Sequence, residues 1–186
     1  EDGKKMSKRL KNYPDPMEMI NKYGADAFRF YLLSAPVARG ETFCFSEKGV
    51  KEVMQKTLML LDNIFNFYQM YAADKAVESE PQSHHVLDRW ILSKLNNLIK
   101  TVTEQLDNYD LMRASRPLVE FIDEFSTWYL RRSRERLKGE GSDQAEALKT
   151  TGYVLLNLIK LMAPFTPFIA EEIYQKIQVE KSKNNV

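Results

Sequence analysis

The segment Leu87–Leu106, LDRWILSKLNNLIKTVTEQL, carries the clearest structural signal in this 186-residue sequence. Its apolar residues recur every three or four positions, at Leu87, Ile91, Leu95, Leu98, Val102 and Leu106. This spacing places them on one face of a helix, with Lys94, Lys100 and Glu104 outside that face. The segment therefore predicts an amphipathic helix of about five turns, whose apolar face needs helical partners.

Similar patterns continue on both sides of this segment. Apolar residues at mixed spacings of three and four predict further helices over residues 47–73, 111–138 and 145–162, and a last helix begins at Pro167. We expect a kink or a restart at Pro117, because proline cannot donate the helical hydrogen bond. Together these segments predict an antiparallel helical bundle.

The residues before the bundle predict a smaller unit. Residues 1–12 are basic and lack apolar periodicity, and short helices are expected from Pro16 to about Tyr23 and from Ala25 to about Ser34. The β-branched and aromatic run Thr42–Phe45 predicts one short strand. The expected fold is thus mainly α, with a small α-rich linking module at residues 1–46 and a helical domain at residues 47–186.

Composition excludes several classes of protein. Hydrophobic residues make up 44% of the chain and charged residues 28%, so we expect an ordered domain with a polar surface. The one cysteine, Cys44, allows no internal disulfide, and the adjacent His84 and His85 lie on a polar linker where we expect them to be solvated. We therefore expect no metal site, no membrane span and no secretory signal, with the cytoplasm as the compartment.

Two basic clusters stand out although the formal net charge is only +1. The first lies in residues 1–12, and the second lies in residues 131–138. Helical spacing brings aromatic and guanidinium groups together in the second cluster, and such groups bind phosphates and stack on bases. The grouped residues are Trp128, Arg131, Arg132, Arg134 and Arg136, and on charge alone a solvated helix end is the favoured interpretation. Tyr129 falls on the apolar stripe and is expected in the core. The alternative is a helical protein-interaction module whose basic ends are solvated.

The motif Lys5-Met6-Ser7-Lys8-Arg9 in the first cluster closely resembles the KMSKS signature of class I aminoacyl-tRNA synthetases. Residues 20–32 resemble the helix pair that joins the catalytic and anticodon-binding domains in this family. Residues 128–134 and 163–168 resemble landmarks of the family's helical domain. This resemblance makes Trp128, Arg131, Arg132, Arg134 and Arg136 the candidate RNA-binding residues. Residues 12–16 and 34–39 are most similar to the isoleucine-specific enzymes, and the valine-specific enzymes are the alternative.

The resemblance implies a function for the first cluster. In the family the second lysine of the signature, here Lys8, stabilises negative charge on the phosphates of ATP, with Lys5 and Ser7 nearby. Arg9 departs from the usual serine. ATP with Mg²⁺, isoleucine and the acceptor end of tRNA(Ile) would bind a Rossmann-like domain that these residues do not contain. We therefore expect the C-terminal portion of a larger ligase, which contacts the anticodon stem-loop, is inactive alone and itself needs no cofactor.

Overall fold

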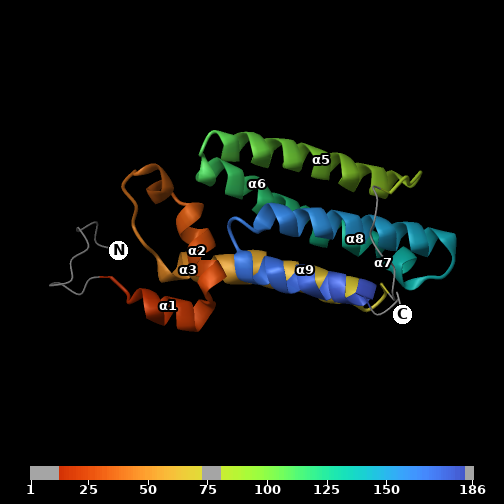
Figure 1. Ribbon diagram of the computed structural model, residues 1–186, viewed down its shortest axis with the longest axis horizontal. Coiled ribbons are helices and arrows are strands. Elements are labelled where there is room, and N and C mark those ends of the chain that lie inside the picture. The colour runs from red at the N-terminus through yellow and green to blue at the C-terminus, as the bar shows by residue number, and fades with distance from the viewer. Residues whose placement is uncertain (1–12, 73–80, 183–186) are drawn as a thin grey trace.

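The computed structural model describes residues 13–72 and 81–182 of the chain. Every regular element within these ranges is helical, which confirms the prediction of a mainly α fold with a helical bundle. Short elements come first and longer helices follow (Figure 1). Their bounds are α1 Pro16–Tyr23, α2 Ala25–Leu33, η1 Pro36–Arg39, α3 Glu47–Val53, η2 Met54–Leu58, α4 Met59–Gln69, α5 Val86–Asp107, α6 Leu111–Asp123, η3 Glu124–Leu130, α7 Arg131–Lys138, α8 Ser142–Met162 and α9 Pro167–Ser182.

Helix α5 buries the face that its sequence pattern predicts. Ile91, Leu95, Leu98 and Val102 are buried there, while Lys100 on the opposite side is exposed. The helix packs antiparallel to α6 and also lies against α8, so its apolar stripe joins the bundle core (Figure 1). The amphipathic pattern therefore sets both the extent of α5 and its orientation in the bundle.

Two of the long helices are continuous but change their winding midway. Helices α3 and α4 are joined by the π-helical segment η2, and α6 and α7 are joined by the π-helical segment η3. Segment η2 packs against α6, and η3 packs against α4. The expected restart at Pro117 is not found, because α6 runs through this proline to Asp123 before the winding changes.

The predicted strand at Thr42–Phe45 is wrong. Residues 41–46 have no regular secondary structure, and no strand lies elsewhere in the part of the chain that the structure describes. Phe43 and Phe45 instead pack on the ring of Tyr31 in α2, with centroid distances of 5.4 and 5.5 Å. An extended segment forms a stable sheet only with neighbouring strands, and here its aromatic residues bind a helix.

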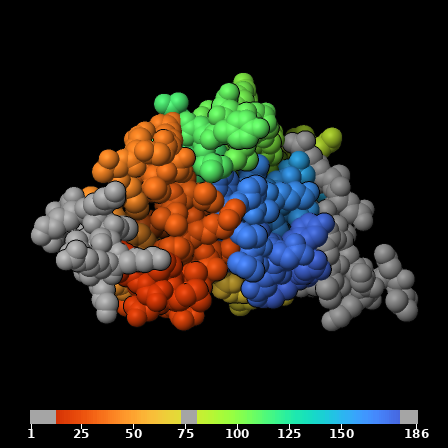
Figure 2. All heavy atoms as spheres, turned by 60° about the vertical axis from the view of Figure 1, so that its left-hand side comes forward, coloured from red at the N-terminus to blue at the C-terminus, as the bar shows by residue number. Residues whose placement is uncertain are grey.

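Helix α2 joins the N-terminal elements to the bundle. The Phe30 ring lies edge-on to Phe165 at a centroid distance of 6.1 Å, and both rings are buried in the common core. The Asp26 carboxylate accepts a hydrogen bond from the backbone nitrogen of Ile169, and Arg29 donates to a carbonyl in the turn before α9. Figure 2 shows this face, where the red and orange N-terminal elements meet the blue C-terminal helices.

The residues just before α5 also differ from the expectation. His84 is exposed, as expected, but His85 is half-buried. The Nδ1 atom of His85 accepts a hydrogen bond from the backbone nitrogen of Leu87 at 3.2 Å, so this histidine caps α5. The sequence pattern missed this role because histidine is not a preferred N-cap residue.

Candidate nucleic-acid interface

The second basic cluster, residues 131–138, forms α7, and Trp128 lies in η3 just before it. Figure 1 shows α7 at the end of the bundle opposite α1 and α2. Four of the predicted RNA-binding residues are exposed there, namely Trp128, Arg131, Arg132 and Arg134. The fifth, Arg136, is half-buried and points into the bundle. We call the four exposed residues the α7 surface.

Trp128 and Arg132 form a stacked pair on the α7 surface. The guanidinium carbon of Arg132 lies 3.7 Å from the centroid of the Trp128 ring, and the tryptophan remains 46% exposed. A guanidinium group over an aromatic face is an attractive cation–π contact, and it leaves the hydrogen-bond donors of the arginine at the edge of the pair. The pair therefore presents aromatic area and positive charge side by side.

Arg131 and Arg134 line a groove between α7 and α4. The groove has a volume of about 240 Å³, and α4 contributes Asn63 and Phe67 to it. The guanidinium carbon of Arg134 lies 5.6 Å from the centroid of the Phe67 ring. An aromatic ring, an amide and two guanidinium groups are the groups with which proteins stack on unpaired bases and bind phosphates. The other lining residues are Ile64, Ser126 and Leu130.

Asn63 and Phe67 were not identified from the sequence. Phe67 is half-buried and Asn63 is exposed, so neither stands out within the apolar pattern of the helix. Their place in the groove depends on the packing of α4 against η3, which joins segments more than fifty residues apart. No local spacing could have indicated that packing.

Arg136 takes part in a buried ion-pair network instead of the α7 surface. Its Nη1 and Nη2 atoms donate to the Asp88 carboxylate at 2.9 and 3.1 Å, and its Nε donates to Asp143 at 2.8 Å. The Arg136 side chain is only 12% exposed. This is not the position of a residue open to RNA, so Arg136 is not part of the proposed binding surface.

Asp88 is the centre of this network. Its side chain is fully buried, and it also accepts hydrogen bonds from the hydroxyl groups of Tyr129 and Ser83, at 2.8 and 2.7 Å. Burial alone would raise the pKa of Asp88, but the hydrogen bonds from Arg136, Ser83 and Tyr129 outweigh it and lower this pKa. Burial of the Tyr129 hydroxyl raises its pKa. Tyr129 itself is completely buried, which confirms its predicted place in the core.

The other predicted site residues lie elsewhere. Lys5, Ser7 and Lys8 are outside the described residues. Within residues 13–72 and 81–182, no group of three or more histidine, cysteine, aspartate and glutamate side chains is arranged to hold a metal ion. None of the described helices combines the length and the apolar character that crossing a membrane requires.

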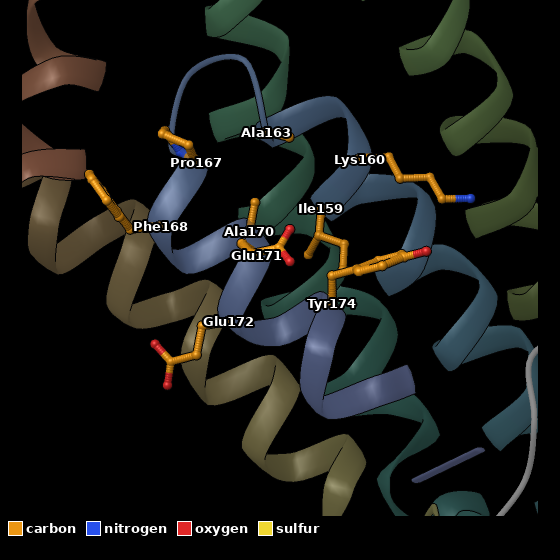
Figure 3. A pocket seen from close by; sticks show the side chains of 9 residues that line it. All are labelled: Ile159, Lys160, Ala163, Pro167, Phe168, Ala170, Glu171, Glu172 and Tyr174. Atoms are coloured by element: carbon orange, nitrogen blue, oxygen red, sulfur yellow. The ribbon is translucent and has the colours of Figure 1, made fainter. Parts of the chain in front are cut away.

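A larger groove, of about 660 Å³, lies between α8 and α9 (Figure 3). Ile159, Ala163 and Ala170 line it, and Lys160 and Tyr174 extend from its edge. Its one lysine is accompanied by Glu171 and Glu172, and none of the predicted RNA-binding residues lines it. Its charges therefore do not favour a polyanion.

The comparison with protein families fits this geometry. Residues 88–185 match the family model described as the anticodon-binding domain of tRNA ligase, and residues 1–44 match the model for class I tRNA synthetases of the I, L, M and V type. The first match covers more than half of the chain and reaches from the first turn of α5 through α9. The chain therefore belongs to the tRNA ligase family that carries this anticodon-binding domain.

Within that family the chain is similar to isoleucine–tRNA ligases, as the resemblance predicted. It is 43% identical over 183 residues to the isoleucine–tRNA ligase of Protochlamydia amoebophila, and 42% identical over 187 residues to the cytoplasmic isoleucine–tRNA ligase of Saccharomyces cerevisiae. These alignments cover 96% and 95% of this chain, but only 18% and 17% of the relatives. The chain thus spans less than a fifth of the length of these enzymes.

Solved structures share the fold. The LeuRS in a ternary complex with tRNA and LeuAMS from Agrobacterium radiobacter K84 matches with a TM-score of 0.68 at 23% identity, over 94% of this chain and 21% of that one. Methionyl-tRNA synthetase of Mycobacterium tuberculosis bound to methionyl-adenylate matches with a TM-score of 0.70 at 22% identity, over 91% and 35%. At these identities the likeness supports the helical architecture alone.

Proposed function

We propose that this chain is the part of an isoleucine–tRNA ligase that binds the anticodon stem-loop of tRNA(Ile) through the α7 surface. The observation that carries the proposal is the grouping of the Trp128–Arg132 stack with the Arg131–Arg134 groove at one end of the bundle. Both features join aromatic rings to guanidinium groups, and both are open to solvent. The similarity to an isoleucine–tRNA ligase over 96% of the chain supports isoleucine as the amino acid.

An anticodon loop has the chemistry that these groups recognise. Its bases are unstacked from a helix and available for stacking, and its phosphates attract guanidinium groups. Arginine is suited to this task because its planar fork pairs with phosphate and its flat face stacks on rings. A surface that binds another protein more often has an apolar centre with few charged residues.

The first basic cluster has a separate proposed role. In the intact ligase, Lys8, assisted by Lys5 and Ser7, would stabilise the charge that develops on the phosphates of ATP during activation of isoleucine. ATP with Mg²⁺, isoleucine and the acceptor end of tRNA would be bound by the remaining parts of the enzyme. In the intact enzyme, Lys8→Ala is expected to lower the rate of isoleucine-dependent exchange of pyrophosphate with ATP more than it raises the apparent KM for ATP. Equal effects on both constants would contradict this role.

We also propose that the chain divides functionally near Ser46. Residues 1–46 would link the catalytic domain to the bundle, and residues 47–186 would form the anticodon-binding domain. The family models match residues 1–44 and 88–185, on either side of that boundary. Physically the two parts share one core, since Phe30 of α2 is buried against Phe165.

The test is a titration of the 186-residue chain with an unmodified tRNA(Ile) transcript at several salt concentrations. The double variant Arg131→Ala with Arg134→Ala should weaken binding and lower the slope of log K against log salt by up to about two units, about one for each phosphate that is no longer bound. The matched control replaces Lys48 and Lys51, two exposed lysines on α3, and so removes the same charge from the other end of the bundle.

Two results would contradict the proposal. If the lysine control loses as much affinity as the arginine variant, binding is a diffuse attraction with no dedicated surface. If the chain binds tRNA(Ile) and tRNA(Val) transcripts only weakly, and binding is insensitive to salt, a protein-interaction module is the better account. Circular dichroism in the far ultraviolet confirms that each variant keeps its helices.

A further inference from the structure

We propose that Arg136 is a positioning residue for the RNA-binding surface. Its bonds to Asp88 and Asp143 hold α7 against α5 and α8, and so fix the direction in which the α7 surface faces. The inference rests on the proposed function, since it concerns the surface that would bind tRNA. It assigns a role to a buried network that the tRNA contacts themselves do not use.

Helix α7 has little apolar surface with which to fix its own orientation. Of its eight residues only Ser133 and Leu137 are buried, and the Ser133 hydroxyl has no hydrogen-bond partner. A small polar side chain and a single leucine constrain rotation about the helix axis only weakly. The hydrophobic effect is nondirectional, so these two side chains would stay buried over a range of helix orientations. Continuity with η3, where Phe125, Tyr129 and Leu130 are buried, anchors the start of α7. The orientation of its later residues depends on polar contacts.

Arg136 supplies a directional contact on one edge of this buried stripe. Successive residues of an α-helix are about 100° apart, so Arg136 and Arg134 flank the line from Ser133 to Leu137 on opposite sides. Arg136 extends from one edge to Asp88 and Asp143, and Arg134 extends from the other edge to Phe67. A rotation of α7 would break the first contact and displace the second.

The partners of Arg136 are themselves firmly placed. Asp88 lies in the first turn of α5 and Asp143 in the first turn of α8, so the guanidinium group connects two helix starts to α7. The pair with Asp88 is bidentate, which restricts the angle of the guanidinium plane as well as its distance. The hydroxyl groups of Tyr129 and Ser83 hold the Asp88 carboxylate in place from the other directions.

The decisive variant replaces both members of the buried pair, Asp88→Asn with Arg136→Met. This change leaves the net charge unaltered, so a general loss of positive charge cannot explain a loss of tRNA binding. The tRNA(Ile) transcript should bind on the order of tenfold more weakly, because the competent orientation of the α7 surface is then less populated in the free chain. The salt slope should stay as in the wild type, because the bound state keeps its phosphate contacts. Amide hydrogen exchange in residues 131–138 should become faster, with the middle of α5 unaffected.

A milder variant covers the case in which the double variant does not fold. Asp143→Ala removes only the outer bond, because Asp143 is 58% exposed and the buried pair with Asp88 remains. It should give a smaller loss of affinity in the same direction, again with faster exchange in α7. A wild-type rate of exchange in α7 together with unchanged affinity, in whichever variant folds, would overturn the proposal.

Two further outcomes are distinct. If the double variant lowers the salt slope by about one unit and leaves α7 exchange unchanged, Arg136 contacts a phosphate directly and the positioning role is wrong. If the wild-type chain binds no tRNA, the proposed function fails, and the exchange rate of α7 in the double variant alone decides whether Arg136 holds this helix.

Discussion

The carboxylate of Asp26 in α2 accepts a hydrogen bond from the backbone nitrogen of Ile169 at 2.7 Å, across 143 residues of sequence. The nitrogen of Phe168 donates to the same carboxylate at 3.3 Å. The first backbone nitrogens of a helix have no partner within the helix, and a side chain usually supplies one from the residue just before it. Here the acceptor comes from a different helix, so capping α9 also attaches the N-terminal helices to the bundle.

Asp26→Ala should therefore destabilise the whole fold. Removing a capping side chain costs about 1–2 kcal/mol, and the two backbone nitrogens would lose a buried, charged acceptor. The measurement is the free energy of unfolding from urea denaturation. Asp15→Ala is the matched control, because Asp15 caps α1 locally and is exposed, and we expect a smaller loss from it. If both variants lose the same free energy of unfolding, the long-range cap stabilises the fold no more than a local cap does.

Gly49→Ala should destabilise the chain although alanine favours helices. A Cβ atom on Gly49 would lie 2.3 Å from Cε2 of Tyr31. The ring cannot move freely, because its hydroxyl accepts a hydrogen bond from the Ser46 nitrogen and it lies nearly perpendicular to the Phe45 ring, in contact with it. Overpacking of this kind costs about 1–3 kcal/mol, which exceeds the gain of about 1 kcal/mol in helix propensity. Thermal unfolding tests the single variant, and adding Tyr31→Ala should make the glycine substitution harmless or favourable.

Tyr109→Gly should make the chain more stable. Tyr109 is 91% exposed and has φ of 57°, a left-handed conformation that costs a bulky side chain roughly 1–2 kcal/mol. It occupies the turn after α5, where its nitrogen donates to Leu106 and the next nitrogen donates to Gln105, a pattern that usually places glycine at this position. Because the side chain packs on little, thermal unfolding should show a gain of up to about 1 kcal/mol after the greater freedom of unfolded glycine is subtracted. Tyr109→Ala keeps the strain and should show no such gain.

Trp128→Ala should weaken tRNA binding with little effect on folding. The indole is half exposed, and stacking of a base on an aromatic side chain is worth about 1–3 kcal/mol. Trp128→Phe keeps an aromatic face and should recover part of the affinity for a tRNA(Ile) transcript. If the phenylalanine variant binds no better than the alanine variant, Trp128 serves Arg132 and not a base.

The buried pair should also shape the acid sensitivity of the fold. The pKa of Asp88 is lowered in the folded chain, so the unfolded chain takes up a proton at higher pH than the folded chain does. The contribution of Asp88 to the free energy of unfolding is therefore complete at pH values above its pKa in the unfolded chain, which is about 3.9. This contribution is lost as the pH falls through the lower pKa of Asp88 in the folded chain. Urea titrations between about pH 6 and pH 2 should show a shallower loss for the Asp88→Asn, Arg136→Met variant than for the wild type. Parallel curves would mean that the carboxylate is not held ionised.

Local patterns in the sequence predicted the helices well and their packing less well. Ile91 and Leu95 recur at helical spacing, and burial of one face follows directly from that spacing. Phe43 and Phe45 show why the strand prediction failed, since β-branched and aromatic residues suit a half-buried extended segment and do not specify a sheet as the partner.

The arginines of the site illustrate the same limit. Arg134 and Arg136 are two residues apart in one helix, yet the first lines a groove and the second is paired in the interior. The difference arises because Arg136 pairs with Asp88, which lies 48 residues earlier in the chain. An aspartate in the first turn of a helix is common because it suits the helix dipole, so its sequence position gave no sign of a buried partner.

The π-helical segment at Glu124–Leu130 absorbs about one residue of helix length. Its hydrogen bonds join residues five apart instead of four, so one turn of it holds about one residue more than an α-helical turn. Deleting a residue in this segment and restoring α geometry would therefore leave Ser133, Arg136 and Leu137 facing nearly their present directions. A one-residue gap in this segment of a related sequence is thus compatible with the same order of basic and apolar positions in residues 131–138. A one-residue gap within α6 would instead turn everything after it by about 100°, and it should occur together with an exchange of those positions.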